Sequence, residues 1–229
     1  MTDAAPSPLQ NRVFPDGSIR AEPARGSLMG NRGILHDHRT KALHPKTRWT
    51  HKAWISCVTT FKGRQREIMA ERRYTELFFL DEVTAMAAGH RPCFECRRDD
   101  ATAFATAWQT GFALPAPPKA KEMDALLHAQ RLEGRQKRVH AIAWGELPVG
   151  AVVHVDPDVG PFESGSFLAK GDTGALVWSA AGYTPVPTDY NLAGHDRCAC
   201  LTPPAMLTVL RSGYRPLWHP SAAQAPTKP

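Results

Sequence analysis

The order of apolar and polar positions along the chain predicts short strands and helices rather than a repeated unit. Residues 53–61, AWISCVTTF, are β-branched and aromatic, a composition typical of a strand. Alternation along that strand would place on one face Ile55, Cys57, Thr59 and Phe61. Residues 74–80, YTELFFL, predict a second short buried strand or an extended segment.

Helix signals follow. In residues 81–90, DEVTAMAAGH, Asp81 is placed to cap the N-terminus and Gly89 suits the left-handed position at the end. Pro92 prevents the helix from continuing. Further helices are predicted over residues 97–112, 120–134 and 202–213.

The chain changes character after about residue 145, where Gly- and Asp-rich turns separate short apolar runs, as in a small antiparallel sheet. The predicted fold class is therefore α+β. The expected organisation is an irregular arm over 1–30, a region with the first strands and helices over 31–114, a linker and helix over 115–144, a β-rich part with a terminal helix over 145–218, and a frayed tail over 219–229.

Composition narrows the class of protein. The 229 residues are 42% hydrophobic, enough for a core, and no apolar run approaches the roughly 20 residues of a membrane helix. The N-terminal residues lack the pattern of a secretory signal, so we expect a cytoplasmic protein with no membrane partner. The net charge is +6, and residues 1–140 hold 23 Lys+Arg against 15 Asp+Glu. That excess suggests a polyanionic partner, or simply a basic soluble surface.

The five cysteines are odd in number and loosely spaced, which argues against a disulfide framework. Cys93 and Cys96 form a C-x-x-C pair, and a tight turn brings two such thiolates to one ion. Zinc prefers four nitrogen or sulfur ligands in a tetrahedron, so the pair is half of a zinc site. A redox pair and a metal-free turn are the alternatives.

Residues 78–100 resemble the second half of the Ada-type zinc-binding module of bacterial alkylation-repair proteins, over about a tenth of the chain. That family shows an aromatic pair, an Ala-rich helix and A-G-[aromatic]-R-P-C-x-x-C-[basic]. The matching positions are Phe78, Phe79, Ala85, Ala87, Ala88, Gly89, Arg91, Pro92, Cys93, Cys96, Arg97 and Arg98. The resemblance implies an Ada-like, zinc-stabilised scaffold over residues 31–114 with a basic face.

Two departures limit the resemblance. His90 stands where the family has an aromatic residue before Arg-Pro. The family's first cysteine pair, after Thr-Thr, is missing: Gly63, Arg64 and Ile68 occupy the corresponding stretch. In the repair proteins one of those cysteines accepts a methyl group, so the resemblance does not imply that activity here.

The remaining zinc ligands must come from elsewhere. Cys57 is the predicted third ligand, because the family's topology would place its strand beside the C-x-x-C turn. It could equally be a small buried hydrophobe. The fourth ligand is open between His90, Cys198, Cys200 and another group, and the C-x-C pair of Cys198 and Cys200 could also close a four-cysteine site with Cys93 and Cys96. The expected cofactor is Zn²⁺.

The basic face predicts contact with phosphate oxygens of nucleic acid, without base readout. Its candidate residues are Arg64, Arg66, Arg91, Arg97 and Arg98. The alternative is that Arg97 and Arg98 pair with neighbouring carboxylates on a solvated helix end.

A second cluster suggests a different function. His36, Asp37 and His38 are residue types found in hydrolytic zinc and non-haem iron sites. They are weak catalytic candidates, with His195 as a possible addition. The sequence therefore favours a zinc protein that contacts nucleic acid. The alternatives are a metal-dependent, possibly nuclease-like hydrolase and a structural zinc protein that acts through protein contacts.

Overall fold

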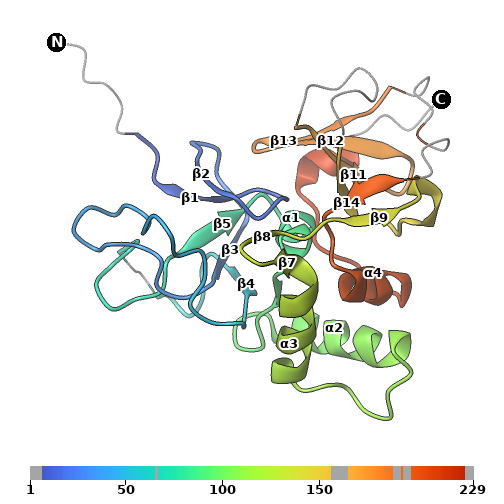
Figure 1. Ribbon diagram of the computed structural model, residues 1–229, viewed down its shortest axis with the longest axis horizontal. Coiled ribbons are helices and arrows are strands. Elements are labelled where there is room, and N and C mark those ends of the chain that lie inside the picture. The colour runs from blue at the N-terminus through green and yellow to red at the C-terminus, as the bar shows by residue number, and fades with distance from the viewer. Residues whose placement is uncertain (1–6, 65–66, 156–164, 188–191, 193–196, 225–229) are drawn as a thin grey trace.

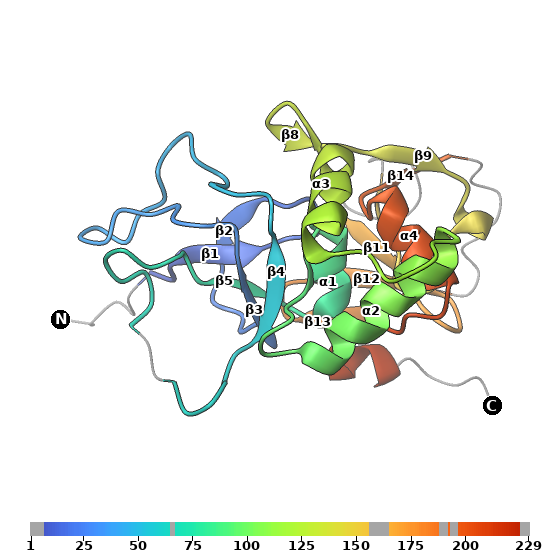
Figure 2. The same ribbon diagram turned by 90° about the horizontal axis from the view of Figure 1, so that it is seen from below.

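The structure is a computed structural model that describes residues 7–64, 67–155, 165–187, 192 and 197–224. Two six-stranded sheets lie on either side of a group of helices (Figures 1 and 2). The α+β class predicted from the sequence is confirmed. No helix among the described residues is both long enough and apolar enough to cross a membrane.

The first sheet has the order β2-β1-β5-β3-β4-β6. Its strands are β1 (Gln10–Val13), β2 (Ile19–Ala21), β3 (Leu28–Asn31), β4 (Ile55–Val58), β5 (Leu77–Phe79) and β6 (Arg91–Pro92). β3 runs antiparallel to β4 and β5, whereas the short β6 pairs with β4 in parallel. The predictions of strands within 53–61 and 74–80 are confirmed by β4 and β5.

The N-terminal segment differs from the sequence prediction. An irregular arm was expected over 1–30, but three strands lie between residues 10 and 31. Each is only three or four residues long, so too few alternating positions exist to reveal a period. Val13, Ile19 and Leu28 are nevertheless buried in one cluster with Leu77 and Phe79, and this burial stabilises the strands.

Helix α1 (Glu82–Ala87) is buried along its whole length. Val83 and Ala87 pack in the core of the second sheet, whereas Ala85 packs in the core of the first. The Asp81 carboxylate caps the helix by accepting a 2.9 Å hydrogen bond from the Thr84 N–H, as predicted. Gly89, at φ +89°, makes the left-handed turn after the helix. The Ala-rich sequence therefore forms a helix that fits between two sheets.

Three longer helices follow: α2 (Arg98–Gly111), α3 (Ala120–Arg131) and α4 (Pro204–Arg211). They confirm the helices predicted within 97–112, 120–134 and 202–213. Their buried faces share one core cluster that includes Phe104, Trp108, Met123 and Met206. Beyond α3, Gly134 turns a hairpin between β7 (Leu132–Glu133) and β8 (Gln136–Lys137).

The second sheet is antiparallel throughout, in the order β13-β12-β11-β10-β14-β9. Its strands are β9 (His140–Ile142), β10 (Val152–His154), β11 (Phe167–Lys170), β12 (Ala175–Ser179), β13 (Gly182–Pro185) and β14 (Cys198–Cys200), and the 3-10 turn η1 (Trp144–Glu146) follows β9. This is the small antiparallel sheet predicted for the C-terminal part.

The frayed tail predicted over 219–229 is wrong for its first residues. The 3-10 helix η3 (Pro220–Gln224) lies against β13, where the Tyr183 N–H donates to Ser221 Oγ at 2.8 Å. The Trp218 ring packs on the Tyr183 ring with centroids 5.4 Å apart. These contacts with β13 order η3, and the polar sequence of this segment gives no sign of them.

Candidate metal centre

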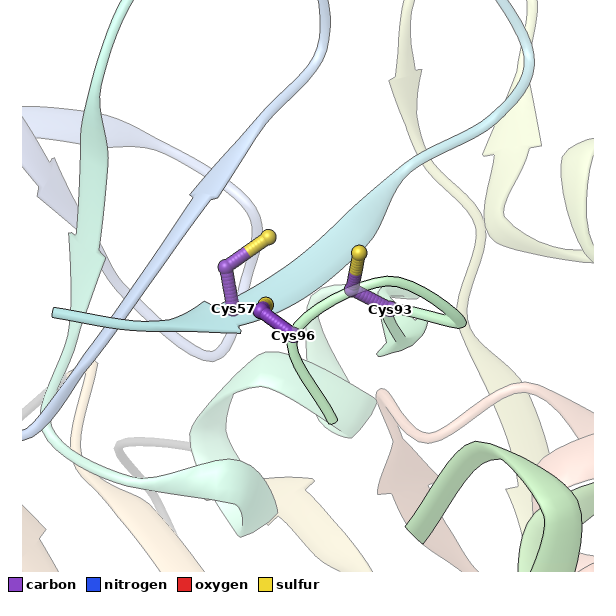
Figure 3. Close-up of side chains that lie close together, drawn as sticks. All are labelled: Cys57, Cys93 and Cys96. Atoms are coloured by element: carbon purple, nitrogen blue, oxygen red, sulfur yellow. The ribbon is translucent and has the colours of Figure 1, made fainter. Parts of the chain in front are cut away.

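Three cysteines meet at the edge of the first sheet (Figure 3). Cys57 comes from β4, and Cys93 and Cys96 come from the turn between β6 and α2. Their sulfur atoms all lie within 4.8 Å of one another. The structure thus brings together the three residues predicted from the sequence as metal ligands.

Backbone hydrogen bonds between β4 and β6 position the cysteines next to one another. The Arg91 N–H donates to the Trp54 carbonyl at 3.1 Å, and the Cys93 N–H donates to the Ser56 carbonyl at 3.0 Å. The parallel register therefore places Cys93 beside Cys57. The turn then closes with the Arg97 N–H donating to the Cys93 carbonyl at 3.0 Å, which presents Cys96 before α2 begins.

The three thiols differ in acidity. The pKa of Cys93 is lowered because its sulfur accepts hydrogen bonds from the Cys57 thiol and from the N–H groups of Cys96 and Glu95. The pKa of Cys57 is raised by the same hydrogen bond to Cys93 and by burial. Burial also raises the pKa of Cys96. Hydrogen bonding within the cluster therefore makes Cys93 the most acidic of the three thiols.

The donor set fits zinc. Zn–S bonds of about 2.3 Å in a tetrahedron require sulfur atoms roughly 3.8 Å apart, so separations within 4.8 Å need only small side-chain rotations. Sulfur donors exclude a preference for Mg²⁺ or Ca²⁺, which take oxygen ligands. The cluster could therefore hold a thiophilic ion, with three ligands from the protein.

A pocket of about 280 Å³ adjoins the three cysteines, and we call it the thiolate pocket. The face of the first sheet that lines it carries Met29, Asn31, Ile55, Cys57 and Phe78. The predicted face of residues 53–61 is confirmed within β4, because Ile55 and Cys57 line this pocket. Thr59 and Phe61 line it from beyond the strand, as does Val58 at the strand end, which alternation assigns to the opposite face.

The far side of the thiolate pocket was not predicted from the sequence. Ile68, Tyr74 and Glu76 line it from the segment that returns to β5. Glu76 is buried and its carboxylate accepts a 2.8 Å hydrogen bond from the Met69 N–H. No short motif marks these residues, because the segment forms no helix or strand before β5.

None of the predicted fourth ligands joins the cluster. Among the described residues, the only group of three or more His, Cys, Asp or Glu side chains with metal-ligating spacing is Cys57, Cys93 and Cys96. Cys198 and Cys200 lie in β14 of the second sheet, within a separate core cluster. His90 is fully buried, with its ring against those of Trp54 and Phe79 at 5.1 and 4.6 Å between centroids. The ring is therefore part of an aromatic cluster and lies outside the group of three cysteines.

Two arginines predicted to face nucleic acid lie inside the protein. Arg91 forms two 2.8 Å hydrogen bonds with the Asp124 carboxylate of α3. Arg97 donates to Glu82 at 2.8 Å, to Asp100 at 2.9 Å and to Ser56 Oγ at 3.0 Å. Their side chains are only 6% and 1% exposed, so both serve the scaffold. The expectation of an exposed patch is wrong for these two residues.

The other predicted arginines are accessible where they are described. Arg64 lines the thiolate pocket and forms a 3.1 Å ion pair with Glu95 across its edge. Arg98 is exposed at the start of α2. Arg66 lies outside the described residues. The five arginines therefore do not share one surface.

The His36, Asp37 and His38 cluster does not converge on a metal. His36 is buried, and its Nδ1 lies 2.7 Å from Thr75 Oγ1. The exposed Asp37 carboxylate instead accepts hydrogen bonds from the N–H groups of Arg39 and Thr40, which lower its pKa. These residues form a turn, and the added candidate His195 lies outside the described residues.

Comparison with family models, with curated proteins and with solved structures finds no match for this chain.

Proposed function

We propose that this chain is a zinc protein in which Cys57, Cys93 and Cys96 bind Zn²⁺. The observation that carries the proposal is the approach of three sulfur atoms to within 4.8 Å from two segments far apart in the sequence. The resemblance of residues 78–100 to the Ada-type module supports zinc as the ion. Bound zinc would join β4 to the turn before α2 and so stabilise this edge of the first sheet.

The fourth coordination position suits an exchangeable ligand. All three cysteines line the thiolate pocket, and the described residues supply no fourth protein ligand at metal-ligating distance. Sites with three protein ligands and one open position are typical of zinc that binds water or a substrate, whereas purely structural sites are closed by four. The pocket walls are largely apolar. Besides the cysteines, the polar side chains that line them are Asn31, Thr59, Arg64, Tyr74, Glu76 and Glu95. We therefore propose that the zinc presents a labile ligand to a small molecule in this pocket.

Metal analysis of the purified full chain tests this proposal. We expect one zinc per chain, and less than a tenth of that in Cys93→Ser. The control is Cys200→Ser, because Cys200 is a buried thiol of the second sheet outside the cluster. Undiminished zinc in Cys93→Ser, or equal loss in both variants, would contradict the assignment.

Contact with nucleic acid stays a prediction that rests on the positive charge of residues 1–140 and on the exposed Arg64 and Arg98. Non-specific contact of this kind weakens steeply with salt. A shift assay on single- and double-stranded DNA and RNA at low salt should show binding, reduced in Arg98→Ala. Absence of binding by the wild-type chain at low salt would remove this hypothesis and leave the zinc proposal intact.

A further inference from the structure

A second pocket, of about 260 Å³, lies between the β1–β2 turn, Trp54 and the β7–β8 hairpin. We call it the arginine pocket. Its lining contains five basic side chains and one acidic side chain: Arg32, Arg48, Arg131, Arg135, Lys137 and Asp16. Such an excess of one sign around a concave site raises the local concentration of anions.

Arg32 is the most deeply placed of these cations, with a relative exposure of 2%. Its Nε donates to His90 Nε2 at 3.2 Å and its Nη1 donates to the Gly17 carbonyl at 2.9 Å. Its Nη2 is buried and has no hydrogen-bond partner in the part of the chain that the structure describes. Buried donors are rarely left unpaired in proteins, so this unpaired N–H group indicates that a ligand accepts its hydrogen bond.

Arg131 lies in the same wall and is fully buried. It donates to the Gly89 carbonyl at 2.9 Å and to the Lys52 carbonyl at 2.7 Å, whereas its buried Nε has no partner among the described residues. A Cβ atom on Gly89 would come within 2.5 Å of the Arg131 Cδ, so glycine also makes room for this side chain.

The Trp54 ring makes cation–π contacts with the guanidinium groups of both arginines. The guanidinium carbon atoms of Arg32 and Arg131 lie 4.1 and 3.8 Å from the ring centre. These cation–π contacts and the carbonyl acceptors replace part of the lost hydration. They do not neutralise the charges, and no ion pair joins Arg32, Arg131 or Lys137 to an acidic side chain within the described ranges.

The pKa values of these basic groups reflect their burial without an ion-pair partner. Burial lowers the pKa of Arg32 and of Arg131 to about 9, and the Arg32 guanidinium lowers the pKa of Arg131 further. Burial likewise lowers the pKa of Lys137, which donates to the Ala87 carbonyl, to about 7. A bound anion would offset this repulsion and hold all three groups in their charged forms.

We propose that the arginine pocket binds a phosphate group, either as the free ion or as a monoester, through Arg32, Arg131 and Lys137. A dianion matches several uncompensated cations better than a carboxylate, and planar guanidinium groups suit phosphate oxygens. The volume is several times the roughly 30 Å³ that one water occupies in the liquid, which leaves room for an esterified group beside the half-buried Trp49. This proposal does not depend on the zinc site.

Titration calorimetry on the metal-free full chain at pH 6.5 and low ionic strength tests the proposal, because phosphate could also bind at an open zinc position. The probes are inorganic phosphate, phenyl phosphate and acetate. We expect saturable 1:1 binding of a phosphate probe and at least tenfold weaker binding of acetate. Equal affinity for both phosphates would identify the free ion as the ligand, whereas at least tenfold tighter phenyl phosphate would identify a monoester.

Variants locate the binding. Arg32→Met and Lys137→Met should each weaken phosphate binding at least tenfold, and Lys137→Met provides the test if Arg32→Met does not fold. The control is Arg98→Met, because Arg98 is exposed on α2 and does not line the pocket. Absence of saturable phosphate binding, equal affinity for acetate, or the same loss in Arg98→Met as in Lys137→Met would overturn the proposal.

Discussion

The thiolate pocket and the arginine pocket both lie beside strands β3 and β4, but their linings have opposite chemistry. Met29 on β3 and Cys57 on β4 line the first pocket, whereas Arg32 and Trp54, just outside those strands, line the second. Side chains at successive positions of a strand point to opposite faces of the sheet. Met29 and Cys57 therefore reach the thiolate pocket, whereas Arg32 and Trp54 at the strand ends reach the arginine pocket. One site gathers sulfur donors suited to a cation, and the other gathers cations suited to an anion.

The segment after α1 contributes to both pockets. Gly89 and His90 accept hydrogen bonds from Arg131 and Arg32, and three residues later Cys93 enters the thiolate cluster. The A-G-H-R-P-C sequence therefore connects two candidate sites. Its composition alone suggested a metal half-site with arginines around it.

The buried arginines differ in whether a carboxylate neutralises their charge. Arg91 and Arg97 are as deeply buried as Arg32, but each is paired with a carboxylate. Arg32 has no such pair among the described residues. We conclude that a buried arginine paired with a carboxylate has a structural role in this protein. A buried arginine without such a pair indicates a binding site for an anion. The predictions below test that distinction.

The largest effect is expected from removing the metal. At a free zinc concentration 1,000 times the dissociation constant, binding to the folded state alone adds about 4 kcal/mol to its stability. We therefore expect chelation to lower the free energy of unfolding by several kcal/mol, measured by urea denaturation. Cys57→Ser should abolish the difference between zinc-loaded and chelated protein. Identical unfolding curves of the wild type with and without zinc would contradict a site in the folded chain.

The next largest effect is expected from breaking a paired arginine. Arg97→Met leaves Glu82 buried without its cationic partner, with the Tyr214 hydroxyl and the Leu217 N–H still donating to it. Breaking one partner of a buried ion pair destabilises proteins by about 3–5 kcal/mol. The same denaturation measurement checks this, with Arg98→Met as the exposed control, expected within about 0.5 kcal/mol of wild type. A change below 1 kcal/mol in Arg97→Met would show that the pairing is not structural.

A smaller effect is expected from Arg32→Met in phosphate-free buffer. This change strands no carboxylate, but it leaves the Gly17 carbonyl and His90 Nε2 without their donor, so the free energy of unfolding should fall by about 1–2 kcal/mol, less than in Arg97→Met. Added phosphate should then raise the melting temperature of wild type but not of the variant. If Arg32→Met is destabilised as strongly as Arg97→Met, the distinction between paired and unpaired arginines fails.

The smallest effect concerns pH. Lys137 has a pKa lowered to about 7, mainly by burial, with Arg32 and Arg131 lowering it and Cys200 and Asp16 raising it. The ammonium is charged below that pKa and neutral above it, so anion binding should weaken as pH rises from 6 to 8. The expected loss is at most about tenfold.

Sulfate is the suitable probe for this pH dependence, because it stays a dianion over the range whereas phosphate titrates. Lys137→Met should remove most of the dependence. The histidines near the arginines, His90 and His128, have pKa values lowered by burial and contribute little charge in this window. An unchanged pH profile in Lys137→Met would exclude Lys137 from the anion site.

The sequence predicted what local spacing determines. Cys93 and Cys96 were found because two ligands three residues apart form one turn, and Asp81 and Gly89 because caps follow local backbone rules. Cys57 followed from the resemblance, and its face followed from strand alternation.

Long-range partners could not be predicted in the same way. Asp124 lies 33 positions from Arg91, and Arg131 lies 99 positions from Arg32, so no periodicity links them. Five arginines, among them Arg91 and Arg97, were therefore assigned to one surface, although tertiary packing pairs these two with buried acids. The basic residues of the arginine pocket were not singled out at all. Pairing of Arg97 with a carboxylate near in sequence was only the alternative prediction; Asp100 forms that pair, but the buried Glu82 was not expected.

The central claim is tested most directly by zinc K-edge X-ray absorption on the zinc-loaded full chain. We predict a first shell of three sulfur atoms at about 2.3 Å and one oxygen or nitrogen atom at about 2.0–2.2 Å. In Cys93→Ser this spectrum should be lost. A first shell without sulfur, or a spectrum unchanged in that variant, would contradict a zinc site at Cys57, Cys93 and Cys96.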